Sequence, residues 1–122
     1  MKTIFESKAV NTGGRSGHVQ SEDGVLDFSI SMPNSKGKPD PKSTNPEELF
    51  AAAYATCFAG ALEYVAKELD MTDLGDFSVT ATISFNTEEE GAFLEATLDA
   101  YLPTVDAEIG EKLVNAAHEI CP

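Results

Sequence analysis

The stretch from Asn45 to about Leu69 constrains the fold more than any other part of the sequence. Asn45 can cap a helix, Pro46 suits the first helical position, and Glu48 follows the cap by three residues. Residues 51–61 are rich in small side chains and apolar over most of a helix's circumference. Small side chains let a neighbouring backbone come close, so we expect a long helix in the centre of the fold.

Two segments after this helix alternate between apolar and polar side chains, which is typical of half-buried strands. They cover residues 77–85 and 94–102, and the run Glu88-Glu89-Glu90-Gly91 predicts the turn between them. A second helix is expected to begin near Asp106, with an apolar stripe through Ile109, Leu113, Ala117 and Ile120. Pro122 favours a non-helical Cys121, so this helix should end there.

The N-terminal third predicts three strands. Short strands are expected at residues 3–10 and 17–21, on either side of a turn at 12–15, and a tight turn follows at 22–24. Alternation predicts a third strand over residues 26–32, and residues 33–45 read as a functional or mobile loop. The order β-β-β-α-β-β-α predicts an α+β fold, with residues 1–122 forming a single domain.

The charge limits the classes of partner. The chain has 122 residues and a net charge of −13, from 21 acidic and 8 basic side chains. Such a chain repels phosphate backbones and anionic lipid surfaces, so we expect neither nucleic acid nor a membrane as partner. The start has no apolar run typical of a signal peptide, and we expect no later stretch to span a bilayer. A cytoplasmic location is the resulting expectation.

The chain has two cysteines, Cys57 and Cys121. In a reducing compartment they are rarely a structural disulfide, and their wide separation fits neither a zinc half-site nor a thioredoxin-type pair. Two interpretations remain open at this point. The thiols are either inert and buried, which composition alone favours, or they meet in space and perform redox chemistry.

In the redox interpretation the two thiols have different roles. Cys57 lies in an apolar helix, so it needs a nearby cation to become a nucleophile. Arg15 is the single arginine and follows two glycines, and an arginine oriented by a carboxylate suits that task. Cys121 lies at a helix C-terminus, where the dipole raises a thiol pKa, which favours Cys57 as the attacking thiol and Cys121 as the resolving one.

Each of these residues also has an ordinary interpretation. Taken alone, Arg15 reads as a solvated turn residue and Glu47 as an acid in the first turn of a helix, where the dipole favours it. His18 and His118 are candidate bases, but an ordinary surface or core histidine is the commoner case. The residues alone therefore support only an α+β domain with two thiols of interest.

Three segments resemble a known family. The run Thr44-Asn45-Pro46-Glu47-Glu48-Leu49-Phe50-Ala51-Ala52-Ala53-Tyr54-Ala55-Thr56-Cys57-Phe58 resembles the first-cysteine signature of the organic hydroperoxide resistance branch of the OsmC/Ohr family. Thr12-Gly13-Gly14-Arg15 resembles that branch's arginine turn, and Ala116-Ala117-His118-Glu119-Ile120-Cys121-Pro122 resembles its second-cysteine segment. The three matches occur in the family's order and at its separations.

The resemblance implies an OsmC-like fold, with antiparallel sheets around two central helices, in an intertwined homodimer. It implies a cysteine-based peroxidase of the oxidative stress response that reduces alkyl and fatty-acid hydroperoxides to alcohols. Cys57 matches the peroxidatic cysteine, Cys121 the resolving cysteine, Arg15 the activating arginine and Glu47 its glutamate partner. Apolar side chains near the site, namely Phe50, Tyr54 and Phe58, would favour an alkyl peroxide over hydrogen peroxide.

The resemblance also bears on cofactors and partners. It implies no metal and no bound organic cofactor, with an external dithiol, dihydrolipoamide or a lipoylated protein, as the reductant. Two alternatives stay open: a non-catalytic binding or scaffold domain of the same fold, and an OsmC-branch peroxidase that accepts a broader range of peroxides.

Two features raise further expectations. The family's second-cysteine segment continues into a final strand, which a chain ending at Pro122 is expected to lack. Glu47 and Cys57 are ten positions apart, which is about 15 Å along a regular helix. We therefore hypothesise that each site takes Glu47 from one subunit and Cys57 from the other, or that Glu47 lies before the helix proper.

Overall fold

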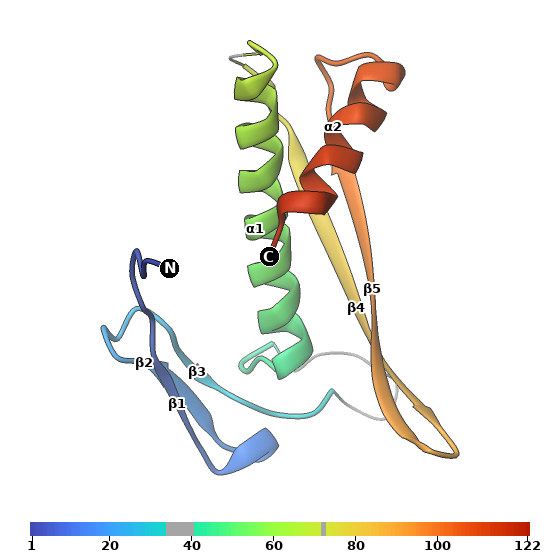
Figure 1. Cartoon of the computed structure of the whole chain (residues 1–122). Coiled ribbons are helices and arrows are strands. Elements are labelled where there is room, and N and C mark those ends of the chain that lie inside the picture. The colour runs from blue at the N-terminus through green and yellow to red at the C-terminus, as the bar shows by residue number, and fades with distance from the viewer. Residues whose placement is uncertain (34–40, 72) are drawn as a thin grey trace. The chain divides into compact units, whose positions relative to one another are not determined.

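The computed structural model describes residues 1–33, 41–71 and 73–122. In chain order the elements are β1 (Ala9–Thr12), the 3-10 helix η1 (Gly14–Ser16), β2 (His18–Ser21), β3 (Asp27–Ser29), α1 (Pro46–Glu68), β4 (Ser78–Glu88), β5 (Gly91–Tyr101) and α2 (Ala107–Ile120) (Figure 1). The predicted α+β class is confirmed. The chain divides into two compact units, residues 1–49 and 50–122, and each is described by itself. The single-domain interpretation stays a prediction.

The first unit contains a three-stranded antiparallel sheet in the order β1-β2-β3. Val19 of β2 pairs with Asn11 of β1 and with Phe28 of β3. The expected strand over residues 3–10 is wrong in its extent, because β1 begins only at Ala9. Its partner β2 is four residues long, and a strand extends only as far as a neighbour accepts its hydrogen bonds.

The third strand is also shorter than expected. It covers Asp27–Ser29 instead of residues 26–32, and Ile30 then forms an isolated parallel bridge with Thr44. Of the predicted loop over residues 33–45, residues 34–40 lie outside the described part of the chain.

The second unit contains the hairpin of β4 and β5 and most of α1, together with α2. The hairpin register runs from Ser78 opposite Tyr101 to Glu88 opposite Gly91, which confirms the two predicted strands and their turn. Both helices contribute to its core, whose buried members are Phe58, Ala61, Leu62, Ala66, Leu74, Leu113 and Ala117. Val79, Leu98 and Ala100 of the hairpin pack against this core, so the sheet and the two helices form one apolar cluster.

Helix α1 begins as its sequence predicts. Asn45 is its cap, since its Oδ1 accepts a hydrogen bond from the Glu48 N–H at 2.8 Å, and Pro46 is the first helical residue. The Glu48 carboxylate in turn accepts a hydrogen bond from the Thr44 hydroxyl at 2.6 Å. Thr44 and Asn45 are both buried, which holds the start of the helix firmly.

The expected central position holds for only part of α1, because its buried side chains lie in the second half, from Phe58 to Ala66. By length and composition alone, α1 is also apolar enough to cross a membrane, so the expectation that no stretch could do so is wrong as stated. The core helix of a globular protein meets the same criteria. Leu62 and Ala66 of α1 lie in the core, and 28% of the most apolar stretch of the helix is buried.

Helix α2 is bounded as expected. The carboxylate of Asp106 caps it by accepting a hydrogen bond from the Ile109 N–H at 3.0 Å. Cys121 follows its last residue in an extended conformation, with φ −70° and ψ 114°, and donates its N–H to the Ala117 carbonyl. Leu113 and Ala117 are fully buried, so this helix places Cys121 at the margin of the core.

Candidate active site

Arg15 lies in a tight turn that the side chain of Asn11 holds together. The amide nitrogen of Asn11 donates to the carbonyl oxygens of Gly14 and His18, each at 3.1 Å, and its oxygen accepts from the Gly14 N–H at 3.0 Å. Gly13 and Gly14 have positive φ values of 85° and 64°, which glycine adopts without strain. Asn11 was not among the predicted residues, although asparagine side chains commonly hydrogen-bond to nearby backbone groups in turns.

The turn directs Arg15 to Glu47. Nη2 of Arg15 lies 2.8 Å from Oε1 of Glu47, and Nη1 lies 3.1 Å from Oε2, so the pairing is bidentate. Nη1 also lies 3.7 Å from the Met32 sulfur. The hydrogen bonds from Arg15 lower the pKa of Glu47 below its usual range, and the same pairing raises the pKa of Arg15.

Glu47 is a residue of α1, in its first turn. The alternative that Glu47 precedes the helix is therefore wrong. The helix N-terminus favours a negative charge, and this adds to the attraction of Arg15 in keeping Glu47 ionised. The side chain of Glu47 is 16% exposed and that of Arg15 is 43% exposed.

The two thiols meet in the second unit. Sγ of Cys57 and Sγ of Cys121 lie 3.2 Å apart, although 64 positions separate them in the sequence. Both cysteines are free, and a disulfide would bring the sulfurs about 1.2 Å closer. Cys57 is exposed, whereas Cys121 is half-buried against the core. Burial raises the pKa of the Cys121 thiol, and the adjacent Cys57 raises it further.

The three residues predicted to favour an alkyl substrate divide into two groups. Phe50 and Tyr54 lie on α1 with ring centroids 5.9 Å apart, seven and three positions before Cys57. Residues at these spacings share one helix face, so the two rings lead towards the thiol. Phe58 instead points into the core and is 2% exposed.

The two histidines lie in different settings. Nε2 of His18 contacts Oδ1 of Asp27 on the neighbouring strand. His118 is exposed in the last turn of α2, where a cation is favourable to the dipole.

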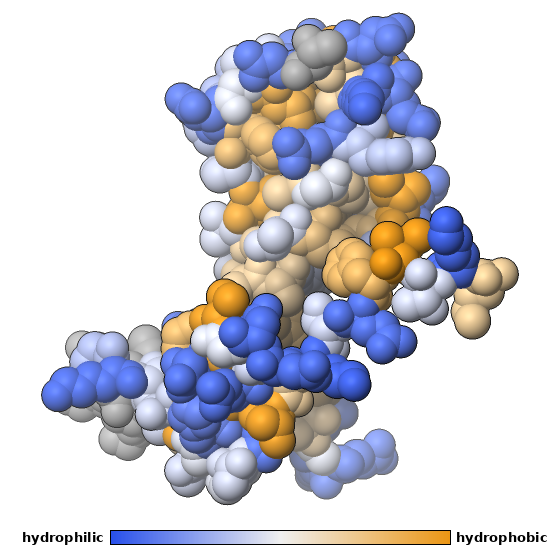
Figure 2. Space-filling view, turned by 90° about the vertical axis from the view of Figure 1, so that its left-hand side faces the viewer, coloured by the Kyte–Doolittle hydropathy of each residue, from blue (hydrophilic) through white to orange (hydrophobic). Residues whose placement is uncertain are grey.

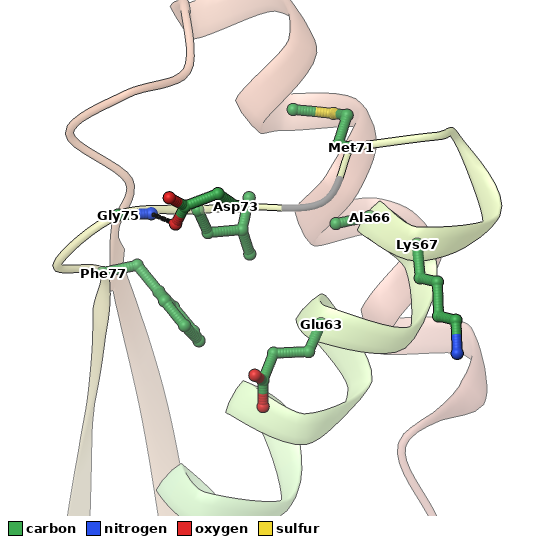
Figure 3. A pocket seen from close by; sticks show the side chains of 8 residues that line it. Glu63, Ala66, Lys67, Met71, Asp73, Gly75 and Phe77 are labelled. Atoms are coloured by element: carbon green, nitrogen blue, oxygen red, sulfur yellow. Dashed lines mark hydrogen bonds between the residues drawn. The ribbon is translucent and has the colours of Figure 1, made fainter.

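A pocket of about 430 Å³ lies at the C-terminal end of α1. Its lining residues are Glu63, Ala66, Lys67, Met71, Asp73, Leu74, Gly75 and Phe77. Figure 3 shows the side chains of Glu63 and Phe77 extending into the pocket. Beside it, the Gly75 N–H donates a hydrogen bond to the Asp73 carboxylate at 2.7 Å. Neither cysteine lines this pocket, so its position gives it no part in thiol chemistry.

The four predicted catalytic residues thus form two separate pairs. Arg15 pairs with Glu47 in the first unit, and Cys57 pairs with Cys121 in the second. Within the described ranges, no group of three or more His, Cys, Asp or Glu side chains could hold a metal ion. A free dithiol suits oxidation to a disulfide, and a bidentate arginine-carboxylate pair holds a guanidinium in a fixed direction.

Comparison with known proteins defines the family. The family model described as OsmC-like protein matches residues 37–122. This match covers more than half of the chain, and the chain therefore belongs to the OsmC-like protein family. The resemblance predicted from the three sequence segments is confirmed.

The individual relatives are similar over nearly the whole chain. Organic hydroperoxide resistance protein OhrB of Bacillus subtilis is 45% identical over 119 residues, which cover 98% of this chain and 87% of the relative. The crystal structure of OhrB superposes with a TM-score of 0.87, covering 98% of this chain and 88% of its own. The crystal structure of an organic hydroperoxide resistance protein OsmC from Legionella pneumophila is 39% identical with a TM-score of 0.88, covering 99% and 88% of the two chains.

Proposed function

We propose that this protein is a cytoplasmic thiol peroxidase that reduces organic hydroperoxides to alcohols. The observation that carries the proposal is the pair of free thiols, with Cys57 Sγ and Cys121 Sγ 3.2 Å apart. Relatives at 45% and 39% identity are named for organic hydroperoxide resistance, which supports the same substrate class.

The proposed cycle begins with attack by Cys57, the more exposed thiol. Its thiolate attacks the distal peroxide oxygen, the O–O bond breaks, and the alcohol leaves after taking up a proton. The Cys57 sulfenic acid then condenses with the Cys121 thiol, which releases water and forms the disulfide. The raised pKa of Cys121 keeps it protonated at neutral pH, as suits the resolving partner.

An external dithiol completes the cycle by two thiol-disulfide exchanges. We propose dihydrolipoamide or a lipoylated protein as this reductant, with no metal or bound organic cofactor. Cys57 is open to solvent, so one sulfur of the disulfide would remain accessible to such a reagent.

An organic substituent has an apolar surface to bind beside the thiol. Phe50 is 46% exposed and packs against Tyr54, which precedes Cys57 by about one turn of α1. Apolar contact with these rings would favour an alkyl peroxide over hydrogen peroxide. Phe58 is buried and packs the next turn of α1 into the core, which keeps the helix segment that carries Phe50 and Tyr54 in place.

The continuous helix makes a two-subunit site the simplest arrangement. Glu47 and Cys57 are ten positions apart on α1, about 15 Å along its axis. A site that uses both groups would therefore take Arg15 and Glu47 from one subunit and the two thiols from its partner. We propose that the protein is an intertwined homodimer for this reason.

Exposed apolar surface supports association of two copies. Phe85 and Leu94 are opposite one another on the hairpin and are 50% and 45% exposed, whereas Val79 and Ala100 on the same strands pack against the core. The apolar face of the hairpin thus continues beyond the part that the helices cover. Figure 2 also shows apolar residues reaching the surface between hydrophilic ones on the face in view. Burial of such surface is the main driving force for association.

Thiol titration tests the peroxidase. One equivalent of cumene hydroperoxide should consume both thiols of the reduced chain, and Cys57→Ser should abolish turnover while Cys121→Ser should trap an oxidised Cys57. Two free thiols after treatment would instead support a non-catalytic binding domain. Equal rates with cumene hydroperoxide and hydrogen peroxide would support a peroxidase of broader substrate range.

Steady-state assays with dihydrolipoamide and with thioredoxin identify the reductant. We expect turnover with the first and little with the second. The opposite order would contradict the proposed reductant and leave the peroxide chemistry intact.

Mixed dimers test the two-subunit site. Cys57→Ser homodimers should be inactive, and Glu47→Gln homodimers should be about 10- to 100-fold less active than the unaltered protein. If each site combines Glu47 of one subunit with Cys57 of the other, a mixed dimer of the two variants contains one intact site, and mixing should restore activity. Mixing without recovery, after subunit exchange is verified by mass spectrometry, would place both groups in one subunit's site.

A further inference from the structure

The spacing of the two thiols also suits them to bind one soft atom together. Cys57 Sγ and Cys121 Sγ lie 3.2 Å apart with no bond between them, and Cys57 is exposed while Cys121 is half-buried. One sulfur is held by the middle of α1 and the other by the C-cap of α2, and both helices are fixed in the same core. Two sulfurs held in this way form a ready bidentate ligand for one soft atom, because thiolates prefer soft centres.

The distance between the sulfurs is short enough for both to bond the same soft atom. A tetrahedral ion with metal–sulfur bonds of about 2.3 Å holds two thiolates about 3.8 Å apart. A centre with bonds of about that length but with angles close to 90° holds them about 3.3 Å apart. The 3.2 Å between the two sulfurs is nearer to the second separation, and a small side-chain movement reaches either one. Trivalent arsenic has bond angles close to 90°, because its lone pair occupies one position and compresses the angles between its three bonds.

The number of available ligands favours the same centre. Over residues 1–33, 41–71 and 73–122, no group of three or more His, Cys, Asp or Glu side chains could hold a metal ion. Ions such as Zn²⁺ take four ligands in structural sites. An arsenical with one organic substituent needs only two sulfurs, since the substituent supplies its third bond.

We propose that Cys57 and Cys121 together bind trivalent arsenicals that carry one organic substituent. With an arsenoxide, the two S–H bonds and the arsenic–oxygen bond break, two arsenic–sulfur bonds form, and the oxygen leaves with both hydrogens as water. Arsenic stays trivalent and no electrons are transferred, so the step needs no oxidant or reductant. The exposed ring of Phe50 and the adjacent Tyr54 offer apolar contact to an aryl substituent.

Phenylarsine oxide is the probe that tests the site. The reduced full chain is mixed with one equivalent, and its intact mass and free thiols are measured. We expect one phenylarsenic group per chain, with the loss of both titratable thiols. An excess of glutathione, a monothiol, should leave the adduct in place, whereas a small dithiol should remove it.

Single-cysteine variants provide the matched controls. Cys57→Ser and Cys121→Ser each keep one thiol, so they should release the arsenical about a hundredfold faster than the unaltered chain, because the second bond is then missing. The protein oxidised to its disulfide should not bind. Circular dichroism checks that the variants fold, and the contrast between monothiol and dithiol release on the unaltered chain depends on no variant.

Two results would overturn the proposal: no adduct on the reduced chain, or an adduct that glutathione removes as readily as it does from the single-cysteine variants. The readout is mass and thiol content, not peroxide turnover. A chain that failed as a peroxidase would still give a decisive answer here.

Discussion

The guanidinium of Arg15 donates two hydrogen bonds, of 2.8 and 3.1 Å, to the carboxylate of Glu47, which lies 32 positions later in the sequence. The arginine comes from a glycine turn and the glutamate from the first turn of α1. Each terminal nitrogen of Arg15 donates to one oxygen of Glu47, so the plane and direction of the guanidinium are set by the helix.

Glu47→Gln should lower kcat/KM for cumene hydroperoxide by about 10- to 100-fold, because charge-assisted hydrogen bonds contribute about 1.5–3 kcal/mol. An amide can accept only one of the two hydrogen bonds, so Arg15 loses its fixed direction. Glu63→Gln, on the same helix and lining the pocket in Figure 3, is the matched control and should leave the rate unchanged. Equal effects of the two substitutions would show that the loss reflects overall charge.

The pairing of Arg15 with Glu47 should also depend on pH. The pKa of Glu47 is lower in the folded chain than in the unfolded one, where it is about 4.3. Around that value the unfolded chain binds more protons, so the stabilisation is fully present above the unfolded pKa and is lost as pH falls through the folded pKa. Urea unfolding measures the free energies of unfolding of the unaltered chain and of Glu47→Gln. These should differ by a constant amount near neutrality, and the difference should shrink in acid. A difference independent of pH would contradict this.

Gly17→Ala should destabilise the arginine turn by about 3 kcal/mol, at the upper end of the range for overpacking. A Cβ at this position would lie 1.8 Å from the Thr12 carbonyl oxygen, a backbone atom that cannot move without breaking the turn. Gly24→Ala is the control, because nothing lies within 4 Å of a Cβ added at Gly24. Only the backbone strain of its positive φ, +79°, applies there, and it costs about 1 kcal/mol. Thermal unfolding measures both, and equal shifts would exclude the close approach as the cause.

The two thiols should react with iodoacetamide in a fixed order. At neutral pH, Cys57 should be alkylated first, because it is exposed whereas burial and the neighbouring Cys57 raise the pKa of Cys121. Labelling of Cys121 should accelerate only above the ordinary thiol pKa of about 8.5. Peptide mapping by mass spectrometry follows each site. Simultaneous labelling of both cysteines would contradict the difference between them.

The strongest local patterns predicted their elements well. Asn45, Pro46 and Glu48 mark the start of α1, and the structure uses Asn45 as the cap, because capping and the fixed φ of proline act over one helical turn. The alternation in β4 and β5 was equally informative. Successive side chains point to opposite faces of any strand, so the pattern does not depend on distant residues.

The sequence by itself determined the helices, the hairpin, the arginine turn and the family resemblance of the two cysteine segments, since each is written in neighbouring residues. The tertiary structure decided that β1 is short, that Asn11 holds the turn, that Phe58 is buried, and that two sulfurs 64 positions apart lie at 3.2 Å. Those outcomes depend on which surfaces pack together. Packing is a balance of burial and chain entropy over the whole unit, and no short stretch of sequence encodes it.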